Sequence, residues 1–407
     1  MGLVVAESRR KLLTTGMVLG VQPSVGMNPL ISDLNDCGEG SVVQLSGRKI
    51  KYDPFLCHLN IHSASADPQT PLILPKSTKF INNVRICAAY DNEADDRMIH
   101  AGKIPMAEIN VNGGCSFGSC NGLLYFAEYH YDEKILLLNP LRNQLRLLPP
   151  ISFPPNDDFL ALMKHYGDPE ESPVNAYGLG FDSSTNNFKM VCILQNTGEC
   201  MGTVVHNLGS NSWRKISSVP RYPIHGKPVF VHGFLHWMLS PLRQFYGDLP
   251  VDQNIISFDV CTEEFQVIPH PGILSENIEE FELIDCYGHF KLFDMSNDLA
   301  VADISMRDKD IDIWVMDYAK KEWSRVYNIR LAETLASAYN EICVYAIACV
   351  YNDNDIGVWK EGEIFVKSYK GYWIFSTHTG GLRFKRISGL GKGDAQILSH
   401  TGSLVSI

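Results

Sequence analysis

Three histidines come closest to a metal-binding pattern in this sequence: His225, His232 and His236. The last two are four residues apart, and on a helix this spacing places two imidazoles on one face, where they could bind zinc. The surrounding segment, VHGFLHWM, has the pattern of a strand pair with a glycine, and residues four apart in a strand are separated by about 13 Å. No H-E-x-x-H acid accompanies them. We therefore place these histidines on strands and predict no metal site.

Two acidic segments could suggest calcium binding. They are DNEADD, from Asp91 to Asp96, and MRDKDID, from Met306 to Asp312. An EF-hand loop alternates acidic ligands and then requires a glycine, and neither segment has this order. We interpret both segments as solvated loops between strands.

The residue types needed for catalysis do not form a recognisable set. Gly178-Leu-Gly180 is not followed by the third glycine of a dinucleotide fingerprint. We therefore assign no catalytic, cofactor-binding or metal-binding residue, and we leave the protein-binding residues unknown. Aromatic residues dominate binding hot spots, so one or two of four tryptophans could anchor a partner. These are Trp237, Trp314, Trp359 and Trp373.

The composition is that of an ordinary globular chain. Of 407 residues, 45% are hydrophobic and 20% are charged, and the formal net charge is -11. This charge repels nucleic acid and anionic membranes, so we expect neither as a partner. The longest apolar run, Cys343 to Tyr351, is too short to cross a membrane. The eleven cysteines form no C-x-x-C pair and are expected to be reduced. The N-terminus lacks the charge order of a secretory signal, so we expect the cytoplasm or the nucleus.

A repeated sequence pattern, called the repeated phrase below, divides the chain into similar units. These units would position the residues of any functional site. A short apolar run ends in a polar residue, and a large residue opens a second apolar run six positions later. The polar residues are Asn139, Asn207, Asp259, Asp317 and Ser376. Each phrase is typical of a β-hairpin whose polar side chain accepts backbone N–H groups and closes the turn. The large residues, Trp213 and Trp323 among them, are expected to pack across their own sheet. A further instance, Asp182 to Phe188, predicts another hairpin of the blade that contains Asn207.

The five phrases recur at intervals of 52 to 68 residues, which indicates a propeller or a solenoid. Preceding strand-like pairs, such as Gly118 to His130 and Gly226 to Leu239, bring each unit to about four strands, which is one propeller blade. Val84 to Tyr90, Ala107 to Gly113 and the C-terminal tail could close the ring. We predict an all-β, propeller-like array of about six four-stranded blades, with seven as the alternative. A proline-rich insertion, Ile151 to Tyr177, is either a recognition loop or a neutral excursion.

The order of these motifs resembles the F-box-associated domain of plant F-box proteins. GSCNGLLYF followed by ILLLNPLRNQLRLLP is similar to the first signature of that family, and YGLGFDSSTNNFKMV is similar to the second. NLGSNSWRKI, VHGFLHWM, IISFDVCTEEFQVIP and DIWVMDYAKKEWSRVYNI follow in the family's order. The resemblance covers about Asp53 to Ile407. It implies a kelch-like propeller that serves as the non-enzymatic substrate-recognition subunit of an SCF-type E3 ubiquitin ligase.

In that family, an F-box before the propeller binds a Skp1-like adaptor. YDPFLCHLNIHSA resembles the segment that follows an F-box, with Asp53, Pro54, Phe55, His58 and Leu59 in family positions. The preceding residues contain glycine or proline at nearly every helical turn, which disfavours a helical F-box. We therefore expect the F-box to be missing or degenerate, and a Skp1-like adaptor to bind only if an F-box is present.

The sequence predicts three parts. Residues 1–52 form an irregular segment in place of an F-box, residues 53–80 a linker, and residues 81–407 the propeller-like domain. The first functional hypothesis is a ligase subunit whose propeller binds an unidentified target protein. The alternative is a stand-alone protein-binding propeller without a ligase link. A distant alternative is a propeller glycoside hydrolase, with a carboxylate pair drawn from different blades.

Overall fold

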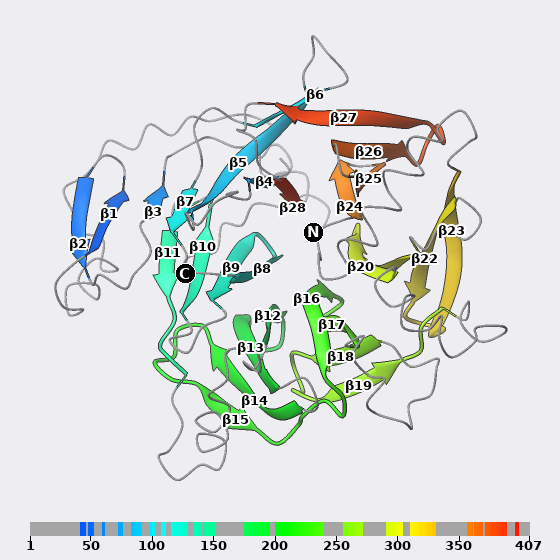
Figure 1. The fold of residues 1–407 in the computed structure, drawn as a ribbon. Helices are drawn as coiled ribbons and strands as arrows, with labels where there is room; N and C mark the ends of the chain where they lie inside the picture. Colours follow the sequence, from blue (N-terminus) through cyan, green and yellow to red (C-terminus); the bar gives the residue numbers. More distant parts are fainter. Residues whose placement is uncertain are drawn as a thin grey trace, which may run out of the picture.

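The computed structural model describes residues 41–45, 48–52, 59–61, 72–75, 83–91, 98–101, 107–110, 115–128, 134–140, 142, 144–151, 175–195, 200–239, 255–271, 290–303, 310–330, 356–360, 362–368, 371–388 and 395–398. All the elements that these residues form, β1 to β28, are strands. They are arranged as sheets around a central axis (Figure 1). The predicted all-β propeller is therefore confirmed. No helix among the residues just given is long and apolar enough to cross a membrane.

Five four-stranded antiparallel blades surround the axis, each with an inner and an outer strand (Figure 1). Blade 1 contains β8 (Cys115–Cys120), β9 (Leu123–Glu128), β10 (Ile135–Asn139) and β11 (Gln144–Leu147). Blade 2 contains β12 (Ala176–Asp182), β13 (Asn187–Gln195), β14 (Cys200–Asn207) and β15 (Arg214–Ile216). Blade 3 contains β16 (Ile224–Val231), β17 (Phe234–Leu239), β18 (Ile255–Asp259) and β19 (Phe265–Ile268). Blade 4 contains β20 (Phe290–Met295), β21 (Asp298–Asp303), β22 (Asp310–Asp317) and β23 (Glu322–Arg330). Blade 5 contains β24 (Ile356–Lys360), β25 (Glu363–Ser368), β26 (Gly371–Ser376) and β27 (Leu382–Ser388).

The prediction of about six blades is wrong, because the described residues form five. The other strands are β1 (Ser41–Leu45), β2 (Arg48–Tyr52), β3 (Leu59–Ile61), β4 (Leu72–Pro75), β5 (Asn83–Asp91), β6 (Met98–Ala101), β7 (Ala107–Asn110) and β28 (Ala395–Leu398). They make no separate four-stranded sheet. The outer strand of blade 5, β27, pairs in parallel with β6, and this pairing joins them to blade 5 in one 12-stranded sheet. The strand β28 pairs with β4, so residues 395–398 lie beside an early strand.

The repeated phrase occupies the same place in all five blades, as the turn between the third and fourth strands. The additional hairpin that begins at Asp182 is β12–β13 of blade 2, as predicted. The predicted turn chemistry is confirmed at Asp259 and Asp317, whose carboxylates accept two backbone N–H groups each. Asp182 accepts the N–H groups of Ser184 and Thr185 in the same way. These bonds satisfy amides that the tight turn leaves without strand partners.

The apolar cores lie between neighbouring blades. In the described part of the chain they include Tyr125 and Met190 for blades 1 and 2, Val191 and Trp237 for blades 2 and 3, Ile255 and Phe290 for blades 3 and 4, and Ile313 and Phe375 for blades 4 and 5. Each large apolar side chain contributes about 1.5–3 kcal/mol when fully buried. The blades therefore stabilise one another face to face.

Two glycines of β12 let blade 3 approach blade 2 closely. A Cβ atom at Gly178 would lie 2.8 Å from the Trp237 ring and 2.9 Å from Pro228. A Cβ atom at Gly180 would lie 2.5 Å from Val260. The YGLGF segment thus has its glycines where side chains of the next blade occupy the space that a Cβ would need.

Candidate functional site

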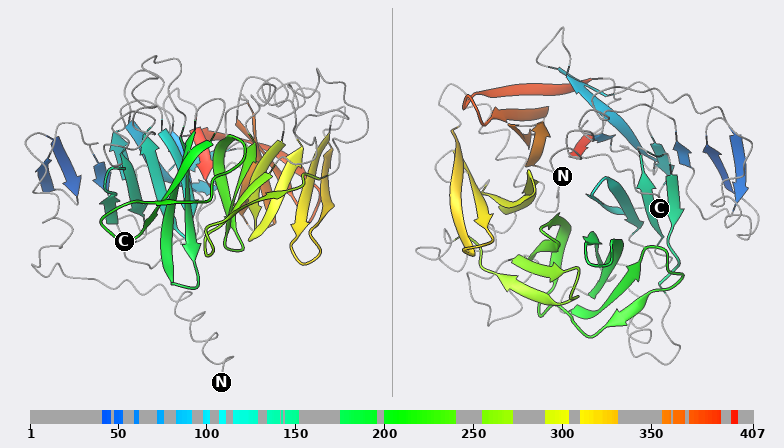
Figure 2. Two further views of the ribbon diagram at one scale, coloured as in Figure 1. Left: turned by 90° about the horizontal axis from the view of Figure 1, so that it is seen from below. Right: turned by 180° about the vertical axis from the view of Figure 1, so that it is seen from behind.

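The strand order gives the propeller two different faces. The chain reverses at every strand of a blade, so the turn between strands one and two lies on the same side as the turn between strands three and four. We call this side the turn face; it includes 183–186, 232–233 and 318–321. On the opposite side, the link face, outer strands end and the inner strands β12, β16 and β20 begin (Figure 2). The insertion predicted as a possible recognition loop lies outside the described residues over 152–174.

A small hollow opens towards the link face between blades 3 and 4. Six residues line it: His225, Lys227, Met238, Phe290, Lys291 and Leu292. They come from β16 and β17 of blade 3 and from β20 of blade 4. The lining thus includes two lysines, a histidine and three apolar residues, and none of the six is acidic.

A β-bulge places Lys227 at the hollow. In the register of β16 with β17, His225 lies opposite Met238 and Val229 lies opposite His236, so β16 has two more residues than its partner between these points. The bulge begins at Gly226, whose φ of 78° lies in the left-handed region that glycine adopts without strain. Bulges redirect side chains, and this one interrupts the strand where Lys227 lines the hollow.

Lys291 forms the opposite wall and is only 7% exposed. Its neighbours Phe290 and Leu292 are buried in the core between blades 3 and 4. The Phe290 ring also makes an edge contact with His270, with 4.3 Å between the ring centroids. Burial lowers the pKa of His270 to about 4, so its ring is neutral at pH 7. The backbone of Lys291 is therefore flanked along the strand by two packed residues, Phe290 and Leu292.

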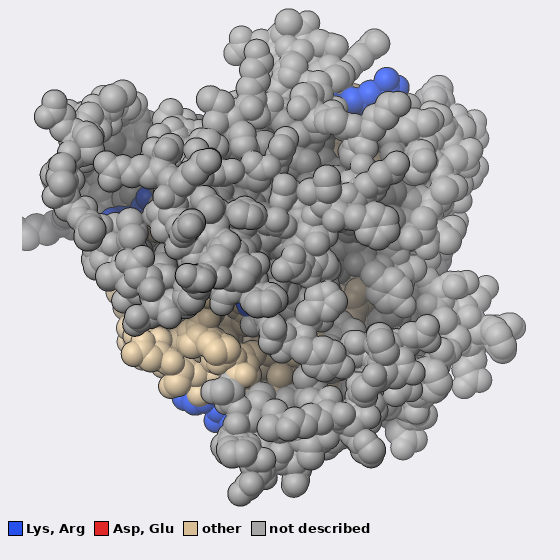
Figure 3. Space-filling model, turned by 60° about the vertical axis from the view of Figure 1, so that its left-hand side comes forward, with Lys and Arg blue, Asp and Glu red and all other residues tan. Residues whose placement is uncertain are grey.

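The formal net charge of the chain is -11. Figure 3 shows one side of the molecule, where the described residues in view are mainly uncharged and a few are Lys or Arg.

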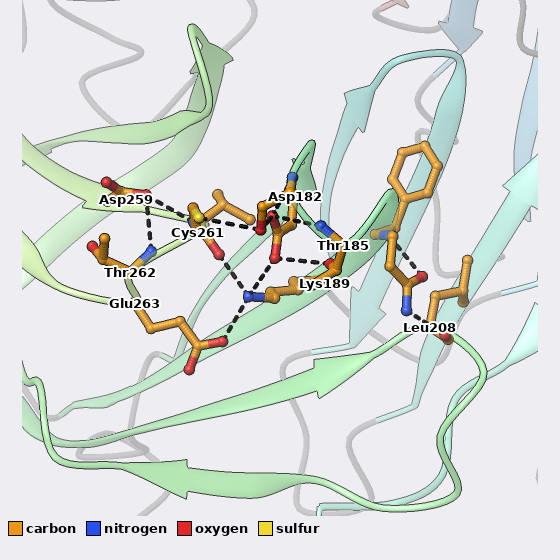
Figure 4. Close-up of polar contacts among 12 residues, drawn as sticks. Asp182, Thr185, Lys189, Leu208, Asp259, Cys261, Thr262 and Glu263 are labelled. Carbon is orange, nitrogen blue, oxygen red and sulfur yellow. Dashed lines mark hydrogen bonds and ion pairs between the residues drawn. The ribbon is translucent and has the colours of Figure 1, made fainter.

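A second polar cluster joins blades 2 and 3 near the turn face (Figure 4). The buried Lys189 Nζ lies 2.9 Å from Asp182 Oδ2 and 2.8 Å from Glu263 Oε1, and it donates to the Val260 carbonyl at 2.8 Å. Arg214 makes a two-pronged ion pair with Glu263. Each charged side chain in this cluster is paired with an opposite charge of the same cluster, so we assign the cluster a structural role. We refer to it below as the blade 2–3 ion cluster.

The pKa values of these groups follow from their pairing. Burial raises the pKa of Asp182, but hydrogen bonds from Ser184, Lys189 and Thr185 outweigh this effect and hold the pKa well below its usual range. Burial likewise raises the pKa of Glu263, and hydrogen bonds from Arg214 and Lys189 lower it further than burial raises it. For Lys189, burial lowers the pKa, and Glu263 and Asp182 raise it above the ordinary value.

The three histidines considered for metal binding occupy different places. His225 lines the hollow, and His232 lies in the turn between β16 and β17. His236 is fully buried, with Nδ1 2.5 Å from Ser257 Oγ and Nε2 2.8 Å from the Tyr318 hydroxyl. Burial lowers the pKa of His236 to about 3, so the ring is neutral and links blades 3 and 4. Within the described ranges, no three His, Cys, Asp or Glu residues are grouped as a metal ion would need.

The acidic segments also have separate places. Asp312 accepts hydrogen bonds from Arg325 and Asn328 on the neighbouring outer strand, which is a structural arrangement. The segment from Asp91 to Asp96 lies outside the described residues except for Asp91 at the end of β5.

The sequence did not predict the hollow, because its lysines belong to no motif. One signal was present, since the Gly-Lys-Pro sequence at 226–228 within a strand is typical of a bulge.

Most of the tryptophans considered as partner anchors lie in the packed interior. Trp237, Trp359 and Trp373 are buried, which does not support the predicted role as exposed partner anchors. The Trp213 ring packs against His206 of its own sheet, as predicted, with 5.2 Å between the ring centroids. Trp213 and Trp323 also reach beyond their own sheets. Their Nε1 atoms donate, each at 2.7 Å, to backbone carbonyls at the end of the preceding blade, at Pro149 and Pro269.

A further sequence match to a catalytic motif has no catalytic geometry. The residues GCSFG, from 114 to 118, have the G-x-S-x-G spacing of a hydrolase nucleophile. That motif places its serine on a strained turn between a strand and a helix. Ser116 instead lies within β8 and is paired with Ala127 in the antiparallel ladder. A Cβ atom at Gly118 would lie 2.7 Å from the Tyr125 ring, so this glycine serves packing.

These features define a β-propeller with apolar cores between its blades and a small hollow beside its inner strands. Comparison with known proteins narrows this class. The family model for the F-box associated beta propeller domain matches residues 78–370, well over half of the chain. The chain therefore belongs to the F-box-associated β-propeller family.

Its relatives include plant proteins with F-box names. F-box protein At3g07870 of Arabidopsis thaliana is 26% identical over 304 residues, which cover 67% of this chain and 64% of that protein. F-box protein CPR1 of the same species is 26% identical over 261 residues, 56% of each chain. The chain thus matches roughly half to two thirds of the length of these relatives. The solved structure of apo AztD from Citrobacter koseri matches over 82% of this chain and 99% of that one, at 9% identity, with a TM-score of 0.38 that carries no argument.

Proposed function

We propose that this protein is the substrate-recognition subunit of an SCF-type E3 ubiquitin ligase. The observation that carries the proposal is the family match over residues 78–370, together with relatives that are F-box proteins. The propeller binds the target and performs no chemistry on it. By holding the target near a ubiquitin-charged partner, it raises the effective concentration of the two reactants.

The hollow fits recognition better than hydrolysis. A glycosidase requires two carboxyl groups about 5–9.5 Å apart around the scissile bond. The hollow is lined by two lysines, a histidine and three apolar residues. Such a set supplies no acid–base carboxylate pair.

A binding experiment tests the ligase role. The protein translated from the full transcript is mixed with a purified Skp1-like adaptor, and complex formation is measured by size-exclusion chromatography. We expect a one-to-one complex. If the folded protein elutes separately from the adaptor at micromolar concentrations, the ligase role is wrong.

The second candidate is a stand-alone propeller that binds the target without a ligase. The sequence of residues 1–52 favours it, because seven glycines and prolines between residues 16 and 40 do not resemble a helical F-box. This candidate predicts target binding without adaptor binding in the same experiment. For both candidates we propose the cytoplasm or nucleus as the location, which imaging of a fluorescent fusion would test.

A further inference from the structure

We propose that Ser217 is a phosphorylation site for a serine/threonine kinase that recognises basic residues on the N-terminal side of its target serine. Ser217 follows Arg214, Lys215 and Ile216, so two cations precede the serine by three and two positions. Kinases of this class select their substrates by charge, because carboxylates of the kinase pair with these cations. The inference does not depend on the ligase role and adds a regulatory site to the propeller.

The motif lies on an accessible edge of blade 2. Arg214 and Lys215 are exposed residues of the outer strand β15, and Ser217 is exposed just after this strand ends. Among the described strands, β15 is the last of its sheet and pairs with β14 alone (Figure 1). An edge strand has a row of backbone groups without strand partners, so a kinase can bind this segment without separating it from two neighbours.

A second motif of the same kind lies where the fold blocks access. Lys385, Arg386 and Ile387 precede Ser388, again with two cations at three and two positions before the serine. Lys385 is only 1% exposed, and its strand, β27, pairs with β26 on one side and with β6 on the other. A kinase would have to open the sheet to bind this segment. We therefore expect phosphorylation at Ser217 and not at Ser388 in the folded chain.

The adjacent Ser218 is a poorer acceptor of a phosphoryl group than Ser217. Ser218 is half-buried, and its Oγ accepts the backbone N–H of Phe265 in blade 3 at 3.1 Å. It also lies one position too far from Arg214 to fit the motif. The fold and the spacing therefore both favour Ser217.

Arg214 already has a partner, which the kinase must replace. Its guanidinium makes a two-pronged ion pair with Glu263, and the Arg214 side chain remains 46% exposed. Ion pairs at the surface contribute little to stability, so a carboxylate of the kinase can replace Glu263 at small cost. Glu263 retains its second partner, Lys189, when Arg214 leaves.

The phosphoryl group comes from a nucleoside triphosphate bound to the kinase. Ser217 Oγ attacks the γ-phosphorus and forms an O–P bond, and the bond from this phosphorus to the β–γ bridging oxygen breaks. The nucleoside diphosphate leaves with the electron pair of that bond, and an aspartate of the kinase takes the hydroxyl proton. The product has about 1.5 to 2 negative charges at pH 7. Because residues 200–239 contain no Asp or Glu, this phosphate would be the first anionic group in that stretch.

The experiment treats the folded full chain with ATP and the catalytic subunit of the cAMP-dependent protein kinase, a probe with this specificity. Mass spectrometry of proteolytic peptides locates the phosphate, and initial rates are measured. Synthetic peptides of residues 210–222 and 381–393 present the two motifs without the fold. Both peptides should be phosphorylated, whereas the folded chain should be phosphorylated at Ser217 and not at Ser388.

The test variant is Arg214→Gln/Lys215→Gln. It should be phosphorylated at Ser217 about ten- to a hundredfold more slowly, as expected for the loss of charged hydrogen bonds to the kinase. The control variant, Lys320→Gln/Lys321→Gln, makes the same change in net charge on exposed residues of blade 4 and should keep the wild-type rate.

Two further variants locate the acceptor hydroxyl. Ser217→Ala should abolish phosphorylation of this segment, and Ser218→Ala should retain it. Circular dichroism verifies that each variant folds. The single variant Lys215→Gln leaves the pair between Arg214 and Glu263 in place, so it keeps the charge test decisive if the double variant does not fold.

Four results would overturn the inference. Ser217 could stay unmodified in the folded chain while its free peptide is phosphorylated, or neither peptide could be a substrate. In the folded chain, Ser388 could be phosphorylated as fast as Ser217. Finally, the folded test variant could keep the wild-type rate, which would show that the two cations do not direct the kinase to this site.

Discussion

The indole Nε1 of Trp213 in blade 2 donates a hydrogen bond of 2.7 Å to the backbone carbonyl of Pro149, just beyond the outer strand of blade 1. Trp323 in blade 4 repeats the relationship with Pro269, just beyond the outer strand of blade 3. A proline after the outer strand of one blade therefore accepts a hydrogen bond from a tryptophan in the last hairpin of the next blade. This bond links the two blades. The spacing of the repeated phrase thus serves the contact between units as well as the turn within each unit.

Replacing Trp213 with phenylalanine should lower the free energy of unfolding. The change removes the donor to the Pro149 carbonyl, and a net intramolecular hydrogen bond contributes about 0.5–1.5 kcal/mol. Urea unfolding followed by fluorescence measures the difference. The matched control is Trp314→Phe, because Trp314 is half-buried like Trp213 and its Nε1 is buried without a hydrogen-bond partner. An equal or larger loss in the control would show that ring size, and not the hydrogen bond, is responsible.

Gly178→Ala should destabilise the contact between blades 2 and 3. The added methyl group would lie 2.8 Å from the Trp237 ring, which is fully buried and cannot move freely. Overpacking of this kind costs about 1–3 kcal/mol, which thermal unfolding would reveal as a lower Tm. Gly202→Ala is the control, since its nearest neighbour would be 3.7 Å away. If both variants melt at the wild-type temperature, the close approach of the blades is not as described.

Asp259→Ala should weaken the turn between β18 and β19. The carboxylate accepts the N–H groups of Cys261 and Thr262, at 2.7 and 3.1 Å. Losing these bonds should cost about 1 kcal/mol in the free energy of unfolding. Asparagine closes the same kind of turn, so Asp259→Asn should retain most of the stability. Equal losses for alanine and asparagine would contradict the assigned hydrogen bonds.

The blade 2–3 ion cluster should make stability depend on pH at both extremes. Asp182 and Glu263 have folded pKa values below their unfolded ones, so their contribution is present above about pH 4.3 and is lost as the pH falls through the folded values. Lys189 has a raised folded pKa, so its contribution is present below about pH 10.4 and is lost as the pH rises through the folded value. Stability should therefore be greatest between these limits.

Lys189→Met tests this cluster. Removing one partner of a buried ion pair costs about 3–5 kcal/mol, so the variant should be much less stable at pH 7. Protonation of the acids at low pH should reduce the difference from the wild type by pH 3. Urea unfolding across this pH range gives both values. Lys320→Met, at an exposed pair, should show no measurable change; a constant penalty for Lys189→Met at every pH would show that packing alone is involved.

The sequence predicted those structural features that depend on residues close together in the chain. Asn139, Asp259 and Asp317 marked the same turn in blades 1, 3 and 4 because each turn needs a polar residue at that position. The blade number was not readable, because pairing between β27 and β6 joins residues almost 300 positions apart in the chain and leaves no local pattern. The residues that line the hollow were not identified for the same reason: they come together only when blades 3 and 4 pack.

The most direct test of the central claim is quantitative mass spectrometry of ubiquitin-modified lysines in plant cells. Cells expressing the full-length protein are compared with untransformed cells, with the proteasome inhibited. We predict that a protein that co-purifies with this chain carries more ubiquitin in the expressing cells. Co-purified proteins whose ubiquitin content is the same in both samples would contradict the role of this propeller in directing ubiquitination.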